Sequence, residues 1–203
     1  MSTGTDRIEA RNELRTAPTE QFGIIFNGPN APLEYKKLPM PQMQPDEILV
    51  KVLFTGVCHS DYHIWKGDWK EPAKRPLIGG HEGVGVVIAI GNKVSFLSGF
   101  QVGGHVAFKV YSPSSFVSEA QYLHNYCLGC ETCLSDDMSS CPDSRLTGYT
   151  ADGTFQQYVA RKASSLQMLS KDINLPEATC ICCPGATVYR VRKLEVCSDN
   201  IGT

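Results

Sequence analysis

Short runs rich in Val, Ile, Leu and Phe, separated by Gly and Pro, dominate residues 22–110. The clearest runs are EILVKVLFTGVC (47–58), GVGVVIAIG (83–91) and HVAFKV (105–110). Apolar runs of this length and composition, bounded by turn residues, predict strands. We therefore expect a mainly β fold, built as an antiparallel barrel or partial barrel rather than as a βαβ repeat.

The later part of the chain adds one turn and one change of pattern. GYTADGTFQQYVA (148–160) predicts a turn followed by a further strand. Only LPEATCICCPGATVYRVRKLEV (175–196) has the character of a helix, with Pro176 near its start, where proline is favoured. The first 21 residues are charged and lack an apolar stretch, so we expect a disordered tail rather than a secretory signal.

Charge and hydropathy exclude two classes of partner. The formal net charge of −2 offers no electrostatic attraction to nucleic acid or to an anionic membrane surface. The longest apolar run, VGVVIAI (84–90), is too short to span a bilayer. We expect a cytoplasmic protein. In that reducing compartment the nine cysteines, an odd number, favour metal binding over a disulfide framework.

Four cysteines lie within fifteen residues, in CLGCETCLSDDMSSC (127–141). Four thiolates suit tetrahedral zinc, and a metal would stabilise a polar loop that has little to bury. An iron–sulfur cluster is one alternative, although the last gap of seven residues is too long for the bacterial ferredoxin pattern. The other alternative to zinc is that these cysteines bind no metal and are free thiols or form disulfides. The predicted structural zinc ligands are Cys127, Cys130, Cys133 and Cys141.

A second, dispersed site is indicated by GVCHSDYHIWKGDW (56–69) and GGHEGVGVVIAIGNKV (79–94). These segments supply the thiol of Cys58, the imidazole of His81 and the carboxylate of Glu82. A zinc ion held by three protein groups with one open position is the catalytic arrangement. Taken singly, each of these residues is commoner as a core or surface residue, so the prediction depends on their joint pattern.

The joint pattern resembles a known family. Residues 80–94 fit G-H-E-x2-G-x5-G-x2-V without a gap, and 56–69, the four-cysteine loop and CPGATVYR (183–190) follow in family order. The sequence resembles the zinc-containing medium-chain alcohol dehydrogenases, and within them the yeast-type fungal branch. The resemblance implies a GroES-like, partly open β-barrel with a zinc-binding lobe.

The domain boundaries follow from the same resemblance. It implies a catalytic domain over 22–175, with a structural zinc lobe at 122–145. The segment 176–203 would lead towards a cofactor domain that is absent or truncated. VYSPSSFVSEAQ (110–121) has no counterpart in the family, so we expect an exposed insert or a retained intron.

The resemblance also assigns metal ligands. It implies Cys58, His81 and Cys183 as ligands of a catalytic zinc, with Glu82 as a nearby alternative ligand. Asp61 would orient a ligand. Cys180, Cys182 and Cys197 are expected to be unliganded; Cys183 is preferred over its neighbours only because it aligns with the family pattern.

Further roles are implied for the residues around the first histidines. Ser60 would take the proton of the alcohol, because a hydroxyl both accepts and donates. His63 would take part in that proton relay or contact the cofactor, and His59 would lie near the cofactor phosphates. Trp69 would narrow the substrate pocket. Lys66 stands where yeast-type enzymes often carry the outer histidine of the relay.

The implied activity is zinc- and NAD-dependent oxidation of a small primary alcohol to an aldehyde, with two zinc ions per chain and oligomers with family members. However, the 203 residues contain no G-x-G-x-x-G turn, so we expect poor activity from this chain alone. The alternative is a non-catalytic zinc-binding fragment that associates with full-length relatives, or a product of mis-splicing.

Overall fold

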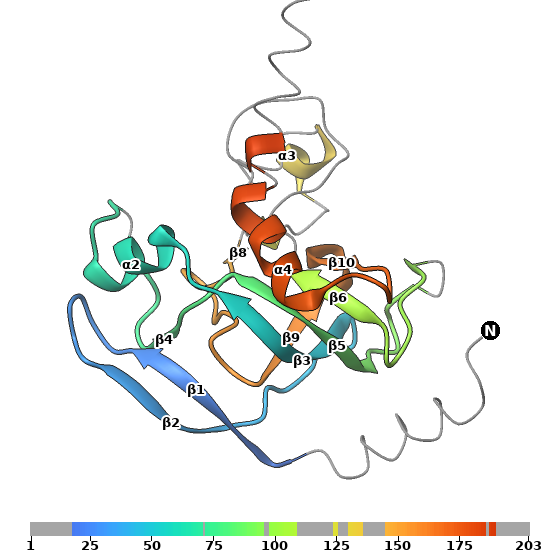
Figure 1. The fold of residues 1–203 in the computed structure, drawn as a ribbon, viewed down its shortest axis with the longest axis horizontal. Coiled ribbons are helices and arrows are strands. Elements are labelled where there is room, and N and C mark those ends of the chain that lie inside the picture. The colour runs from blue at the N-terminus through green and yellow to red at the C-terminus, as the bar shows by residue number, and fades with distance from the viewer. Residues whose placement is uncertain are drawn as a thin grey trace, which may run out of the picture.

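The computed structural model describes residues 18–70, 72–95, 98–108, 124–125, 130–135, 145–185 and 187–189. This part of the chain is mainly β, as the sequence predicts (Figure 1). The strands are β1 (Glu20–Phe26), β2 (Leu33–Pro39), β3 (Glu47–Gly56), β4 (Leu77–Ile78), β5 (Glu82–Ile90), β6 (His105–Phe108), β7 (His124–Asn125), β8 (Arg145–Leu146), β9 (Tyr158–Lys162) and β10 (Leu166–Met168). The helices are α2 (His59–Lys66), α3 (Glu131–Leu134) and α4 (Leu175–Cys180), with a 3₁₀ turn η3 (Ala163–Ser165) and a π-helical turn η4 (Ile181–Gly185).

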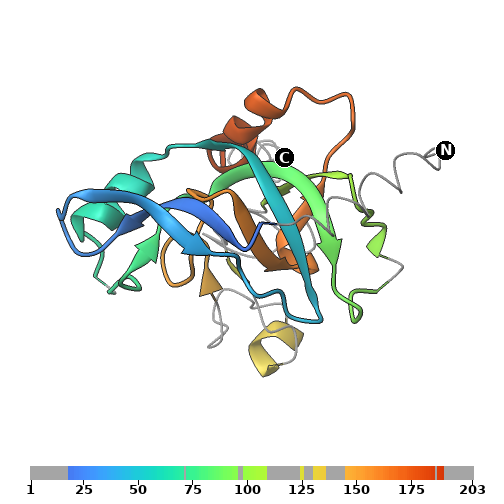
Figure 2. The same ribbon diagram turned by 90° about the horizontal axis from the view of Figure 1, so that it is seen from below.

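A curled five-stranded antiparallel sheet, in the order β10-β6-β5-β3-β9, forms the body of the fold (Figure 2). Strands β9 and β10 lie at opposite edges of this sheet, yet only the three residues of η3 separate them in sequence. A connection so short forces the two edges towards each other, because the four residue steps from Lys162 to Leu166 span at most about 14 Å. The sheet therefore closes into a half-barrel. The runs expected at 47–58, 83–91 and 105–110 are confirmed as β3, β5 and β6.

A second antiparallel sheet, in the order β2-β1-β4, lies beside the half-barrel. It is joined to the turn before β9 by backbone hydrogen bonds, including one from the N–H of Ile24 to the carbonyl of Phe155 at 2.8 Å. Strand β1 begins at Glu20, two residues before the expected domain start. The turn and strand expected over 148–160 are present, although β9 itself starts only at Tyr158.

The core follows from the alternation along the strands. Ile48, Val50 and Val87 point into the half-barrel with almost no exposed surface. Helix α4 packs against β3 and β5, where Leu175 and Ala178 meet Val84. The end of α4 is thereby held beside the start of β5. No described helix is long and apolar enough to cross a membrane.

The helices confirm one expectation and correct another. Pro176 lies in the first turn of α4, as predicted, and the helix continues as the π turn η4. Helix α2 was not predicted, and the expectation that only the C-terminal stretch is helical was wrong. Its eight residues have no long apolar period. The helix depends instead on Asp61, which accepts a hydrogen bond from the N–H of Cys58 at 3.0 Å, and on Gly67, which ends it with a φ of 81°.

Candidate metal centre

Four side chains that could ligate a metal converge at one end of the half-barrel. The ligand atoms of Cys58, His81, Glu82 and Cys183 all lie within 4.8 Å of one another. Cys58 follows β3 and precedes α2, His81 and Glu82 lie at the start of β5, and Cys183 lies in η4. Three segments far apart in the sequence thus meet where α2 and α4 flank the sheet (Figure 1).

His81 presents one ring nitrogen to this cluster. Its side chain is buried, and Nδ1 lies 2.9 Å from Oδ1 of Asp61. Because a carboxylate only accepts hydrogen bonds, Nδ1 carries a proton that it donates to Asp61. Nε2 is then the ring nitrogen that faces the cluster. Nε2 is buried and has no hydrogen-bond partner among the described residues. A buried nitrogen without a partner, close to two sulfurs and a carboxylate, fits a zinc ion.

Asp61 ties together the two segments that carry the ligands. Its carboxylate is buried and accepts three hydrogen bonds, from the N–H of Cys58, the N–H of Gly80 and the ring of His81. Gly80 has a φ of 89°, a left-handed conformation that favours glycine, and this turns its N–H towards the carboxylate. One side chain therefore positions both the thiol of Cys58 and the imidazole of His81.

The groups of the cluster shift one another's protonation. Burial by itself lowers the pKa of His81, yet Asp61 and Cys183 outweigh burial and raise that pKa to about 11. Burial also raises the pKa of Glu82. His81 lowers the pKa of Cys183, whereas burial and Cys58 raise it. The two raising effects together are larger, so the pKa of Cys183 lies above its usual value. The metal-free cluster thus retains protons that a metal would displace.

The structure separates Cys183 from its neighbouring cysteines. The thiol of Cys182 is buried and donates to the carbonyl of Ala178 at 3.4 Å, and burial raises its pKa to about 12. Cys180 is exposed on α4. Neither belongs to the cluster of four. Cys197 lies outside the described residues.

The predicted relay and pocket residues lie around helix α2. Ser60 is half-buried, with Oγ 3.7 Å from the sulfur of Cys58. The rings of His59 and His63 lie with their centroids 4.5 Å apart, and Nδ1 of His63 is 2.9 Å from Oδ2 of Asp68. Ser60 thus adjoins the cluster, while the rings of His59, the first residue of α2, and His63, one turn later, lie against each other.

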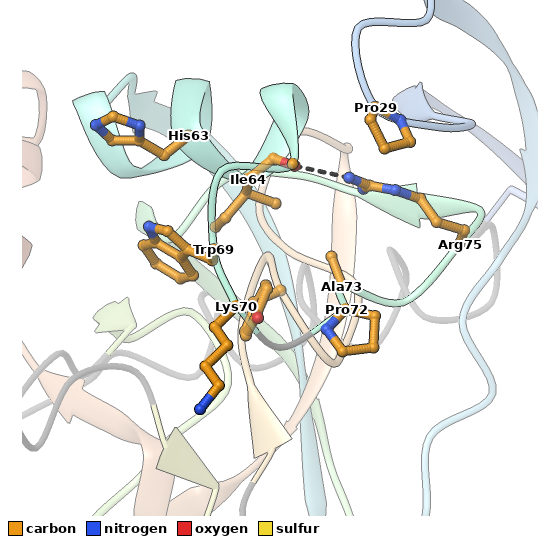
Figure 3. Close-up of a pocket in the computed structure, with 10 residues that line it drawn as sticks. Pro29, His63, Ile64, Trp69, Lys70, Pro72, Ala73 and Arg75 are labelled. Atoms are coloured by element: carbon orange, nitrogen blue, oxygen red, sulfur yellow. Dashed lines mark hydrogen bonds between the residues drawn. The ribbon is translucent and has the colours of Figure 1, made fainter.

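Trp69 packs with its ring edge-to-face on Tyr149, at 4.8 Å between centroids. It lines a pocket together with His63 (Figure 3), and the described lining includes none of the four cluster residues. Two further lining residues, Lys70 and Arg75, were not singled out from the sequence. No motif or period marks them, since they come together through the turn that follows α2.

The four-cysteine loop falls mostly outside the described residues. Cys127 and Cys141 lie there, as do the side chain of Cys133 and the expected insert at 110–121. Cys130 is described; it precedes α3, with its sulfur 3.0 Å from the hydroxyl of Thr132. The structural zinc site stays a prediction.

Comparison with known proteins now decides the family. The model of the alcohol dehydrogenase GroES-like domain matches residues 44–171, more than half of the chain. The chain belongs to the alcohol dehydrogenase GroES-like domain family. The half-barrel and helix α2 lie within these residues, and they form the GroES-like domain that the resemblance implied.

Several solved structures are similar to this chain. A cinnamyl alcohol dehydrogenase from Sorghum bicolor is 25% identical, with a TM-score of 0.69 over 87% of this chain and 48% of its own. An NAD-dependent alcohol dehydrogenase is 27% identical, with a TM-score of 0.66 over 79% and 43%. CAD from Helicobacter pylori, complexed with NADP(H), is 20% identical and shares the fold, with a TM-score of 0.70 over 87% and 49%. The chain spans less than half the length of each.

Proposed function

We propose that Cys58, His81 and Cys183 hold a zinc ion, with Glu82 as a nearby alternative ligand. The observation that carries this proposal is the buried Nε2 of His81, which lacks a partner while two sulfurs and a carboxylate lie within 4.8 Å. In the metal-free protein a buried polar atom of this kind is costly to leave unpaired. Two thiolates and one imidazole form a ligand set that zinc uses at catalytic sites.

The proposed reaction is the reversible oxidation of a small primary alcohol to an aldehyde, with NAD as hydride acceptor. The family and the similarity to an NAD-dependent alcohol dehydrogenase support it. Because this chain covers less than half of that enzyme, the NAD site is assigned to the part of such enzymes that this chain does not match. The motif at 56–69 supports placing the chain in the yeast-type branch of the family. We also propose that the protein is cytoplasmic.

Each residue around the cluster would have its own role in the oxidation of the alcohol. A bound zinc acts as a Lewis acid that lowers the pKa of an alcohol. Ser60, beside Cys58, takes the alcohol proton, since its hydroxyl can accept one proton and donate another. His63, held by Asp68, would pass the proton outwards or contact the cofactor. His59 would contact the cofactor phosphates.

Asp61 and Trp69 complete the arrangement. Asp61 keeps the proton of His81 on Nδ1, so that Nε2 can ligate the metal. Trp69 would limit the size of the substrate. The four cysteines of 127–141 would hold a second, structural zinc, which gives two zinc ions per chain.

Metal counting on single-cysteine variants tests the zinc proposal. Purified chain should contain two zinc ions, and Cys183→Ser and Cys133→Ser should each lose one of them. Cobalt substitution should give sulfur-to-cobalt charge-transfer absorption that weakens in Cys183→Ser, whereas Cys182→Ser, the matched control, keeps it. Cys183→Ser with full metal content would contradict the proposed ligand set.

Turnover separates the enzyme from a zinc-binding fragment. Formation of NADH from ethanol, in proportion to the concentration of chain, would show catalysis by this chain itself. We expect little such turnover. Co-purification with a full-length dehydrogenase would favour the fragment that associates with its relatives; a monomer that binds no relative would count against it.

A further inference from the structure

Gly56 is the last residue of β3, and it lies directly opposite Glu82, the first residue of β5. The two strands are neighbours in the five-stranded sheet (Figure 1). Residues opposite each other in an antiparallel pair point to the same face of the sheet. A side chain at position 56 would therefore compete for space with the side chain of Glu82, beside the candidate metal centre.

The backbone does not require a glycine at position 56. The described glycines with a positive φ, where a side chain is strained, are Gly67, Gly80, Gly99, Gly103 and Gly148. Gly56 is not one of them, so an alanine could adopt its backbone conformation. The reason for a glycine at this position lies in the atoms around it.

The space beside Gly56 is filled by the carboxylate of Glu82. A Cβ added at Gly56 would lie less than 3.0 Å from Oε2 of Glu82, closer than real Cβ atoms approach other atoms, and 3.2 Å from the Cβ and Cδ of the same side chain. These are its three nearest atoms once the chain neighbours of Gly56 are set aside. Among the described glycines, Gly56 is the only one whose nearest atoms belong to a residue of the four-residue cluster.

An added methyl group at position 56 would displace the carboxylate rather than the strands. The backbone at both positions is held in the pairing of β3 with β5, whereas Oε2 is the end of a flexible side chain. Glu82 is buried, and one of its carboxylate oxygens lies within 4.8 Å of the sulfurs of Cys58 and Cys183. Displacement from Gly56 would therefore change how the carboxylate lies among the proposed ligands.

We propose that Gly56 is a positioning residue of the metal centre, because its lack of a side chain keeps the carboxylate of Glu82 among the sulfurs and the imidazole. This inference rests on the proposed zinc site. A carboxylate held in this position adds a negative charge beside the cation, and the attraction is strong where water is excluded. Gly56 itself touches no metal; it acts only through Glu82.

A double-mutant cycle tests the inference. Competition with a chelator measures the affinity for the zinc ion that Cys183→Ser lacks, in the parent chain, Gly56→Ala, Glu82→Gln and the double variant. Each single variant should weaken binding about tenfold, since loss of a group that supports metal ligands costs about 10- to 100-fold. The double variant should bind no more weakly than either single one, because both changes remove the same carboxylate from the same place.

Two outcomes of the cycle would overturn the inference. If the effects of Gly56→Ala and Glu82→Gln multiply to about a hundredfold, Gly56 acts independently of the carboxylate. If Gly56→Ala has the parental affinity, its lack of a side chain does not matter to the metal. Gly28→Ala is the matched control, because Gly28 also lacks a positive φ and an added Cβ would meet only the Cβ of Ala31, at 4.0 Å. This control should keep the parental affinity.

The spectrum of the cobalt-loaded chain separates positioning from a general loosening of the fold. Gly56→Ala and Glu82→Gln should shift the visible ligand-field bands of cobalt in the same way, because both alter the same group beside the metal. Val87→Ala, which removes a contact in the core of the half-barrel, should lower stability in urea yet keep the parental bands. Parental bands in Gly56→Ala would contradict the inference.

Failure of the proposed zinc site would give a different result. In that case Cys183→Ser would retain full metal content, and the inference about Gly56 would fall with the site. If Cys183→Ser loses one zinc ion while Gly56→Ala behaves as the parent chain does, the zinc site stands and only the inference about Gly56 is wrong.

Discussion

Oδ1 of Asp61 lies 2.9 Å from Nδ1 of His81, and the same carboxylate accepts the N–H of Cys58. Two proposed ligands from different segments are thus oriented by one buried group. We expect Asp61→Asn to weaken zinc binding about 10- to 100-fold, the usual effect of removing a partner of a ligating histidine. Competition with a chelator measures the change. Asp68→Asn, which alters an exposed carboxylate beside the same helix, is the matched control and should retain parental affinity.

The raised pKa of His81 predicts how the metal-free protein responds to pH. Its folded-state pKa of about 11 exceeds the usual value of 6.5, so its contribution to stability is complete below pH 6.5 and is lost as pH rises through 11. Urea unfolding of the chelator-treated chain between pH 6 and 10 should show this loss. With zinc bound the dependence should reverse, since the metal competes with protons for the ligands. If His81→Asn leaves the metal-free profile unchanged, the assignment is wrong.

Gly80 combines a left-handed backbone with close neighbours. An added Cβ would lie 2.4 Å from the ring of Phe155, at a φ of 89°. Gly103 has a similar φ of 83° but nothing within 4 Å of that position. Gly103→Ala should therefore show only the backbone strain of about 1–2 kcal/mol. Gly80→Ala should destabilise the chain by about 1–3 kcal/mol more, because the crowded site must also expand. Equal losses in urea unfolding would rule out this account.

Arg161 has an unusual environment for a charged side chain. Its Nε and Nη2 are buried without a partner among the described residues, while Nη1 donates to the carbonyl of Ala160 at 2.8 Å, and burial lowers its pKa. We expect Arg161→Met, which keeps much of the volume, to raise the free energy of unfolding by about 1 kcal/mol. Arg161→Ala, which removes the same charge but leaves a cavity, should lack this gain. A less stable Arg161→Met would show that the guanidinium has a stabilising partner.

The sequence determined the body of the fold and much of the candidate site. The apolar runs at 47–58, 83–91 and 105–110 became β3, β5 and β6, because β-branched residues bounded by turns suit buried strands. Motif spacing also pointed to Cys58, His81 and Glu82, which the structure brings together. It did not reveal α2, whose eight residues rely on a cap by Asp61 and on the end at Gly67 rather than on an apolar period.

Only the tertiary structure distinguished the three cysteines near the end of the described chain. By sequence, Cys183 differed from Cys180 and Cys182 through family resemblance alone. Packing of α4 on β3 and β5 fixes the rotation of the helix and of the turn that follows it. Successive helical residues are rotated by about 100° about the axis, so one thiol faces solvent, one the core and one the cluster. The pocket lined by Trp69 was equally hidden in the sequence, because its lining residues meet only where the turn after α2 folds back against the helix.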